Sequence, residues 1–347
     1  MFTIRPHSSH SGSFRRAQLP LLAVALTAAA AVFVALPRPA SAQASGYGWP
    51  VKPFNMAHPV RANFGDPRTS FNGPPTLATL NEGTGIFQFH FGVDIAVPDY
   101  TPVYPVCSGV TRLLSGRTVA VNCGGGRVTE YWHIVPSVSA GQKVVAYETV
   151  LGRVMKGYEH VHFTERQHGV AVNPLAPGHL TPYQDTTTPT VESIEFRTND
   201  TGPELLPEFV HGRVVVIAQV SDMPSIPVPG IWADLPVAPA LLTWHVERAS
   251  NGKVVVPRRT AFDVRQTLPE CPFWSLYARG SRQNASNFGG HKAWREPGIY
   301  LFKLDPSGFD TTRLPNGIYR LVVTAADIRG NTSSSQQTFV IRNGQGS

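Results

Sequence analysis

Short apolar stretches separated by turn residues recur along most of the chain. In "TVAVNCGGGRVTEYWHI", residues 118–122 and 127–134 alternate in β-favouring side chains around three glycines, which predicts a β-hairpin. Later stretches of the same kind are "GRVVVIAQVSD", "ALLTWHVER", "GIYLFKLD", "GIYRLVVTAAD" and "QQTFVIR". Strands at this spacing, with Gly, Asn, Asp and Pro between them, are typical of a β-sandwich. We therefore expect an all-β protein with little helix.

A change in composition separates two strand-rich regions. The segment "LTPYQDTTTPTVESIEF" is rich in Thr and Pro, as expected of a connection between domains. A turn-rich insertion that carries Cys271, Trp274 and Trp294 interrupts the second region. The predicted division is a leading segment at 1–42, a first domain at 43–182, a linker at 183–190, and a second domain at 191–347 with its insertion near 268–297.

The leading segment resembles an export signal. Arg5, Arg15 and Arg16 precede an apolar stretch at 19–36, and "PRPASAQA" follows with a small-residue cleavage pattern that places the cut after Ala42. The apolar stretch is long for a signal, so an uncleaved membrane anchor is the alternative. In both cases the rest of the chain lies outside the cytoplasm, and a membrane is a partner only if the segment stays attached.

Composition and charge narrow the class of function. Only 15% of residues are charged, against about 25% in typical domains, and the 31 Gly and 31 Pro favour turns and strands. The formal charge is +7, but four arginines and no acidic residue lie within residues 1–42, so the mature chain carries +3. This charge is too small to indicate nucleic-acid binding.

The three cysteines are Cys107, Cys123 and Cys271. Cys107 and Cys123 lie on neighbouring predicted strands, so in an oxidising compartment we predict a disulfide between them and leave Cys271 single. The alternative is a cysteine nucleophile paired with a histidine. The stretch "YPVCSGVTRL" argues against it, because no helix start lies near Cys107 to lower the pKa of its thiol.

Five residues in three stretches have side chains suited to metal chemistry. "FQFHFGVDIAV" places His90 and Asp94 in an apolar stretch, either as a buried hydrogen-bonded pair or as metal ligands. In "YEHVHFTE", His160 and His162 are two apart and point to the same face of a strand. His133 ends a further predicted strand. Two imidazoles and one carboxylate suit Zn²⁺ and leave a fourth position for water.

The order of these stretches resembles the M23 family of zinc metallopeptidases, which includes the lysostaphin and LytM-like endopeptidases. The resemblance covers about residues 60–175 and rests on "HPVRANFGDPR", "HFGVDIAVPDYTPVYPVCSGV", "TEYWHIVPSVSAGQKVVAYETVLGRV", "HVHF" and "VNPL". It implies an antiparallel-sheet catalytic domain with one Zn²⁺ per chain held by His90, Asp94 and His162. It also implies that His133 and His160 are catalytic without binding the metal. The C-terminal strands resemble an Ig-like β-sandwich.

Two positions depart from the family pattern. Thr164 stands where the family has the glutamate of "HLHFE", with Glu165 one residue later, and "MKGYEHVHF" lacks the usual Ser-Thr-Gly lead. These changes leave the expected ligands in place. They affect the groove wall, and so the substrate preference.

The function expected from these features is that of an exported zinc metalloendopeptidase. Its substrate would be the stem peptides or cross-bridges of peptidoglycan, in a secreted, cell-wall-associated protein. Two alternatives remain open. One is a non-catalytic LytM-like module that binds the wall or activates another hydrolase, and the other is a zinc peptidase that acts on secreted proteins.

Overall fold

The structure is a computed structural model that describes residues 46–70, 86–286 and 295–344. The predicted export signal at 1–42 and Trp294 lie outside the described residues. Residues Ala42–Ser347 form one compact unit. Within the described ranges, no helix has the length and apolar character needed to cross a membrane.

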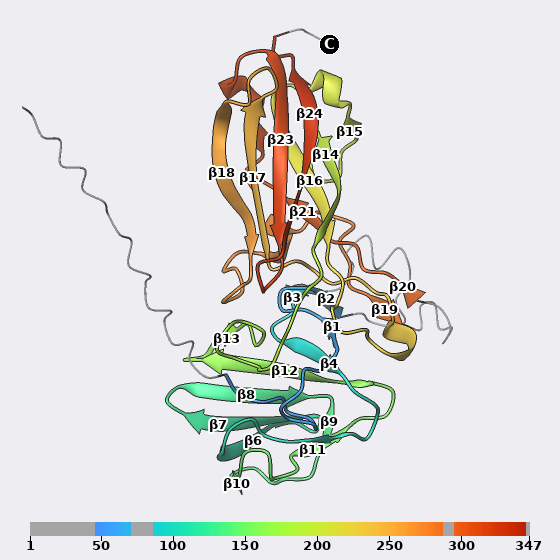
Figure 1. Ribbon diagram of the computed structural model, residues 1–347, viewed down its shortest axis with the longest axis vertical. Coiled ribbons are helices and arrows are strands. Elements are labelled where there is room, and N and C mark those ends of the chain that lie inside the picture. Colours follow the sequence, from blue (N-terminus) through green and yellow to red (C-terminus); the bar gives the residue numbers. More distant parts are fainter. Residues whose placement is uncertain (1–45, 71–85, 287–294, 345–347) are drawn as a thin grey trace, which may run out of the picture. The chain divides into compact units, whose positions relative to one another are not determined.

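An eight-stranded antiparallel sheet dominates the N-terminal half (Figure 1). Its strands are, in order across the sheet, β1 (Val60–Ala62), β4 (Val93–Ala96), β12 (His160–Gln167), β8 (Arg127–Trp132), β7 (Thr118–Gly124), β6 (Gly109–Ser115) and β10 (Lys143–Val144), with β13 (Val170–Val172) paired to β12. The predicted hairpin is confirmed as β7 and β8. The glycines at its turn have φ of 81°, 60° and 80°, a region that favours glycine.

Two smaller sheets accompany the eight-stranded sheet. They are β2 (Pro67–Ser70) with β3 (Ile86–Phe89), and β5 (Pro102–Val103) with β11 (Gly152–Val154) and β9 (Ile134–Pro136). The predicted disulfide between Cys107 and Cys123 is confirmed and ties the approach to β6 to the end of β7, with a Cα–Cα distance of 5.7 Å. Cys271 is not disulfide-bonded.

The C-terminal half contains two large antiparallel sheets. The first consists of β15 (Glu204–Leu205), β14 (Thr190–Arg197), β16 (Arg213–Ser221) and β21 (Leu301–Lys303), with β22 (Phe309–Asp310) on β16. The second consists of β18 (Val254–Asp263), β17 (Leu241–Arg248), β23 (Gly317–Ala326) and β24 (Thr332–Ile341). Phe196 packs on Phe339 at 4.9 Å and Trp244 on Phe309 at 5.9 Å between ring centroids, so the two sheets share a core. We call these two sheets the sandwich.

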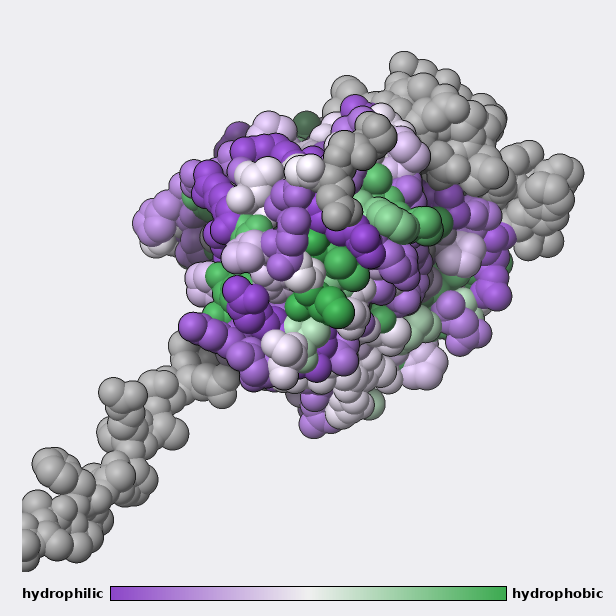
Figure 2. All heavy atoms as spheres, turned by 90° about the horizontal axis from the view of Figure 1, so that it is seen from above, coloured by the Kyte–Doolittle hydropathy of each residue, from purple (hydrophilic) through white to green (hydrophobic). Residues whose placement is uncertain are grey.

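The all-β prediction is confirmed, because the helical segments that the structure describes are short. They are α2 (Phe273–Leu276), η1 (Pro207–Phe209), η2 (Gly230–Trp232) and η4 (Thr311–Arg313). The expected insertion contains α2 and a small sheet of β19 (Ala285–Ser286) and β20 (Arg295–Glu296). The face shown in Figure 2 is largely hydrophilic, with hydrophobic residues in separate patches.

The predicted domain boundaries stay a prediction. β14 begins at Thr190, the last residue of the expected linker at 183–190, and most buried apolar side chains of the two halves belong to one continuous hydrophobic cluster. Phe87 packs on Phe273 with 5.6 Å between ring centroids, and the Asn173 amide donates a hydrogen bond to the Val264 carbonyl oxygen. The halves are therefore in direct contact.

Three carboxylates gather where the linker meets the sandwich. Oxygen atoms of Asp185, Asp222 and Asp327 lie within 4.8 Å of one another. Burial, helped by the neighbouring Asp185, raises the pKa of Asp222 to about 7. The folded state therefore holds a proton on Asp222 that an unfolded chain releases near pH 4.

This raised pKa predicts how stability depends on pH. The contribution of protonated Asp222 is complete below about pH 4 and is lost as pH rises through about 7. Between pH 5 and 8, wild type should lose stability relative to Asp222→Asn by on the order of 2 kcal/mol. The urea concentration that unfolds half of the protein, measured at pH 5 and at pH 8, gives this change in stability. Asp234→Asn, at an exposed site, is the control for removing one charge. Parallel profiles for wild type and Asp222→Asn would contradict the prediction.

The disulfide predicts a second effect on stability. It closes a loop with a sequence separation of 16, for which the loss of chain entropy in the unfolded state is worth about 3 kcal/mol. The double variant Cys107→Ala/Cys123→Ala should therefore unfold at a lower urea concentration than the oxidised wild type. Cys271→Ser, which leaves the bridge intact, should change the midpoint less. Equal midpoints for oxidised wild type and the double variant would refute this expectation.

Candidate metal centre

Strand pairing places two of the predicted ligands on one face of the eight-stranded sheet. Asp94 on β4 lies directly opposite His162 on the neighbouring strand β12. His160 is two residues before His162 on the same strand, so its side chain lies on the same face. The pairing of β4 with β12 therefore brings the carboxylate and both imidazoles together.

His90 reaches the same point from the connection between β3 and β4. Its backbone is fixed by two hydrogen bonds of 2.8 Å, from His90 N to Asp66 O and from Gly65 N to His90 O. The ring Nδ1 donates to the carbonyl oxygen of Asn63 at 2.8 Å. Nε2 therefore carries the lone pair.

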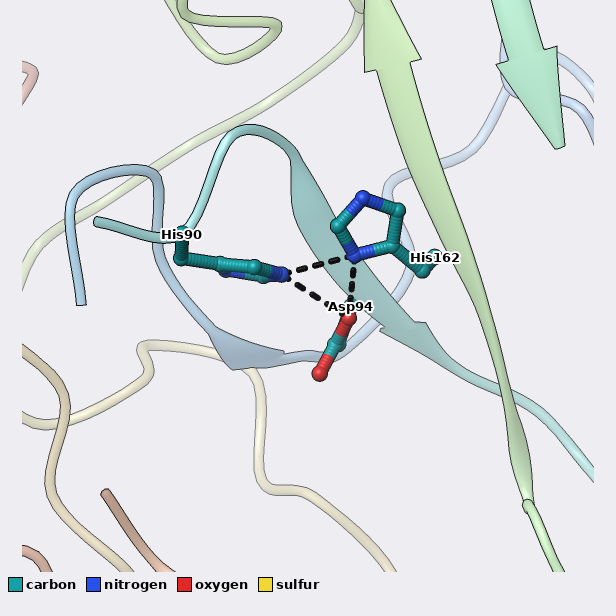
Figure 3. A group of neighbouring side chains, drawn as sticks. All are labelled: His90, Asp94 and His162. Atoms are coloured by element: carbon teal, nitrogen blue, oxygen red, sulfur yellow. Dashed lines mark hydrogen bonds and ion pairs between the residues drawn. The ribbon is translucent and has the colours of Figure 1, made fainter. Parts of the chain in front are cut away.

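Three ligand atoms converge (Figure 3). The distances are 2.7 Å from His90 Nε2 to His162 Nδ1, 3.1 Å from His162 Nδ1 to Asp94 Oδ1, and 3.2 Å from His90 Nε2 to Asp94 Oδ1. All three residues are at most 5% exposed. Tetrahedral zinc with ligands at 2.0–2.2 Å would space them about 3.3 Å apart. The set fits such an ion, with the two histidine nitrogens somewhat closer together.

The charge states also suit a metal. Burial, together with Arg68, lowers the pKa of His90 to about 3, so its imidazole is neutral. Burial alone would raise the pKa of Asp94, but His160, His90 and Arg68 outweigh it and hold this pKa well below its usual value. A neutral imidazole and an ionised carboxylate are the forms that bind zinc.

Gly92 permits the close approach of β12 to this centre. A Cβ at this position would lie 2.4 Å from Phe163 O and 2.8 Å from both His162 Nε2 and Thr164 Oγ1. The Thr164 hydroxyl lies 2.9 Å from His162 Nε2 and leaves Nδ1 for the ligand cluster. Thr164, noted in the sequence only as a departure from the family, thus orients a predicted ligand.

The two predicted catalytic histidines lie beside the cluster. His160 Nδ1 donates to Tyr158 O at 2.6 Å, and its Nε2 is 3.6 Å from Asp94 Oδ1. His133 follows β8 with a φ of 63°, stacks on Tyr158, and has its ring centroid 4.7 Å from that of His160. Burial lowers the pKa of His133 to about 4. The structure thus brings all five predicted residues together, while their roles stay a prediction.

The cations at this centre are not among the residues predicted from the sequence. Arg68 Nη2 donates to Asp94 Oδ2 at 3.0 Å, and Arg61 Nη2 lies 3.2 Å from His160 Nε2. Trp232 stacks on Arg61, with 3.7 Å from the ring centroid to Cζ. Both arginines lie within "HPVRANFGDPR", and the pairing of β1 with β4 and of β2 with β3 brings that segment to Asp94. Nothing in the sequence links Trp232 to the centre.

Comparison with known proteins identifies one family that matches part of the chain. Residues 88–174 match the family model described as Peptidase family M23. This confirms the resemblance seen in the motifs. None of the curated proteins matches the chain.

Several solved structures are similar to part of the chain. The SpoIIQ–SpoIIIAH pore-forming complex has 24% identity over 38% of this chain and 90% of that one, with a TM-score of 0.29. A zinc-containing peptidase from Vibrio cholerae has 19% identity over 37% and 39%, with a TM-score of 0.28. The catalytic domain of lysostaphin from Staphylococcus simulans has 20% identity over 31% and 89%, with a TM-score of 0.23.

The contact at Gly92 predicts the effect of one added methyl group. Gly92→Ala would push against the Phe163 carbonyl and the ring of His162, so the variant should bind zinc about 10- to 100-fold more weakly. Competition with a chromogenic chelator measures the affinity. Gly116→Ala is the matched control, since no atom lies within 4 Å of the Cβ it adds. Unchanged affinity in Gly92→Ala would show that this approach does not position His162.

Proposed function

We propose that the chain is an exported zinc metalloendopeptidase that hydrolyses peptide bonds in the stem peptides or cross-bridges of peptidoglycan. The observation that carries the proposal is the convergence of His90 Nε2, Asp94 Oδ1 and His162 Nδ1 on one point. The M23 match supports peptidase chemistry, because this family generally consists of zinc metallopeptidases. The proposal goes beyond peptidase chemistry in two respects, which are peptidoglycan as the substrate and the export of the protein.

In the proposed mechanism, His90, Asp94 and His162 would hold one zinc ion. A bound zinc ion supplies a Lewis acid and lowers the pKa of water to about 7. His160 is fixed by its Nδ1–H bond to Tyr158 O, so its Nε2 lone pair faces the groove and can accept a proton from a water there. His133, beside it, can orient the substrate carbonyl or return the proton to the leaving amine.

Export is supported by two features. The leading segment has the basic, apolar and small-residue parts of a signal. The Cys107–Cys123 disulfide is typical of proteins that work in an oxidising compartment outside the cytoplasm. We therefore propose a secreted or cell-wall-associated location.

One contact favours a second candidate, a non-catalytic module that binds wall peptides or activates another hydrolase. Arg61 Nη2 lies 3.2 Å from His160 Nε2, the lone pair that proton transfer requires. If Arg61 stays there when substrate binds, His160 cannot act as a base. The intact set of ligands favours the peptidase.

The two candidates differ in turnover. Zinc-loaded wild type should release new amino groups from purified sacculi, and a chelator should stop the release. His90→Ala removes a ligand, so it should lose most bound zinc and lower the rate roughly 100-fold or more. Zinc per chain and the release of amino groups are the measurements. His211→Ala, at an exposed site, is the matched control.

Each outcome selects one function. Full activity of His90→Ala would refute the peptidase. Zinc binding and adhesion to sacculi without turnover would favour the non-catalytic module. Cleavage of unstructured secreted proteins, with sacculi left intact, would favour a peptidase for protein substrates.

A further inference from the structure

A groove extends from the metal centre along both arginines. Its volume is about 330 Å³, and it is lined by Asp94, His133 and His160 from the centre, by Arg61 and Arg68, and by Trp232 and Asn284 from the C-terminal half. A peptide held at the centre would therefore lie against both guanidinium groups. The C-terminal half provides part of the wall.

Arg61 is a buried cation with an incomplete set of partners. Its side chain is 10% exposed, Nε is 3.7 Å from Asp94 Oδ2, and Nη2 is 3.2 Å from His160 Nε2. Nη1 is buried and has no hydrogen-bond partner among the described residues. A buried guanidinium nitrogen without an acceptor lowers the stability of the folded state, so the presence of Arg61 at this position needs an explanation.

A second unpaired atom lies on the same groove. Thr69 Oγ1 is also buried without a partner among the described residues. Of the four such side-chain atoms found in residues 46–70, 86–286 and 295–344, two therefore belong to residues that line this groove. Buried polar groups are nearly always hydrogen-bonded, so two unpaired atoms in residues of one groove need an explanation, and a polar ligand would supply one.

The positive charges of the groove are also incompletely paired. Its charged lining residues are Arg61, Arg68, Asp66 and Asp94. The Asp66 carboxylate already accepts hydrogen bonds from the backbone N–H groups of Asn63 and Ala238. With Asp94 Oδ1 committed to a divalent metal, the two guanidinium groups would share only Asp94 Oδ2, which lies 3.0 Å from Arg68 Nη2 and 3.7 Å from Arg61 Nε. Burial lowers the pKa of Arg61 and the Glu159 carboxylate opposes this shift, but the Glu159 side chain is exposed to solvent.

We infer that Arg61 and Arg68 form a subsite for a carboxylate of the peptide substrate, next to the scissile bond. This inference rests on the proposed peptidase function. A planar guanidinium matches a carboxylate with two parallel hydrogen bonds, and the Trp232 ring on the face of Arg61 keeps its plane fixed and excludes water. Binding there would also draw Arg61 from His160 Nε2 and free this nitrogen for catalysis. The carboxylate is either an acidic side chain or the C-terminus of the peptide.

Matched peptides test the subsite. The probes are acetyl-hexaglycine-amide peptides with one Glu at each position in turn, their Gln counterparts, and the hexaglycine peptide with a free C-terminal carboxylate. Initial rates are measured with zinc-loaded full-length wild type. Affinities are measured by calorimetry with the zinc-loaded His133→Ala variant, which keeps the three ligands.

Wild type should prefer Glu over Gln, or free acid over amide, by about 10- to 100-fold at one position. Arg61→Gln should reduce this preference to less than about threefold and keep its zinc. Arg61→Lys should restore only part of the preference, because an ammonium group lacks the planar pair of donors. Arg112→Gln, an exposed arginine on β6, is the matched control and should keep the full preference.

Three results separate the possible failures. If wild type cleaves or binds acid and amide peptides equally at every position, the subsite is refuted while the peptidase stands. If Arg61→Gln loses zinc, or loses activity equally on both kinds of peptide, Arg61 only positions Asp94 and His160, and the subsite is refuted. If wild type cleaves nothing, the peptidase fails, and a carboxylate preference in binding alone still decides the subsite.

Discussion

The pairing of β4 with β12 is the constraint on which the rest of the site depends. It sets Asp94 opposite His162, while Val93, Ile95, Val161 and Phe163 alternate with these residues and are fully buried in the core. A slip of one residue would exchange the two faces, placing the ligands in the apolar core and the apolar side chains at the groove. The hydrophobic contacts that hold the fold therefore also fix the geometry of the metal centre.

The electrostatics of the centre follow from this burial. An isolated carboxylate at the depth of Asp94 would be costly, and Arg68 at 3.0 Å offsets the cost. The same arginine opposes protonation of His90, which keeps that imidazole available as a ligand. A structure arranged to hold a neutral ring beside an ionised carboxylate is well suited to receive a cation. It also has to tolerate a surplus of positive charge once the cation is bound.

Local sequence patterns identified much of the site. His160 and His162 are two apart on a strand, and His90 and Asp94 are four apart in an apolar stretch, so short-range spacing marked them as candidates, while the resemblance to the M23 family joined them into one site. The hairpin, the disulfide and the all-β class also followed from alternation and turn residues. These features depend on neighbours in the sequence or on adjacent strands.

The features that escaped prediction depend on distant contacts. Trp232 reaches Arg61 across 171 positions of sequence, from the connection between β16 and β17, and no local pattern marks that contact.

The division of the site between the two halves of the chain has a consequence for how amino-acid substitutions can change it. The predicted metal ligands lie in one half of the chain and a wall of the groove in the other, so substitutions in the later half can reshape the groove without disturbing those ligands.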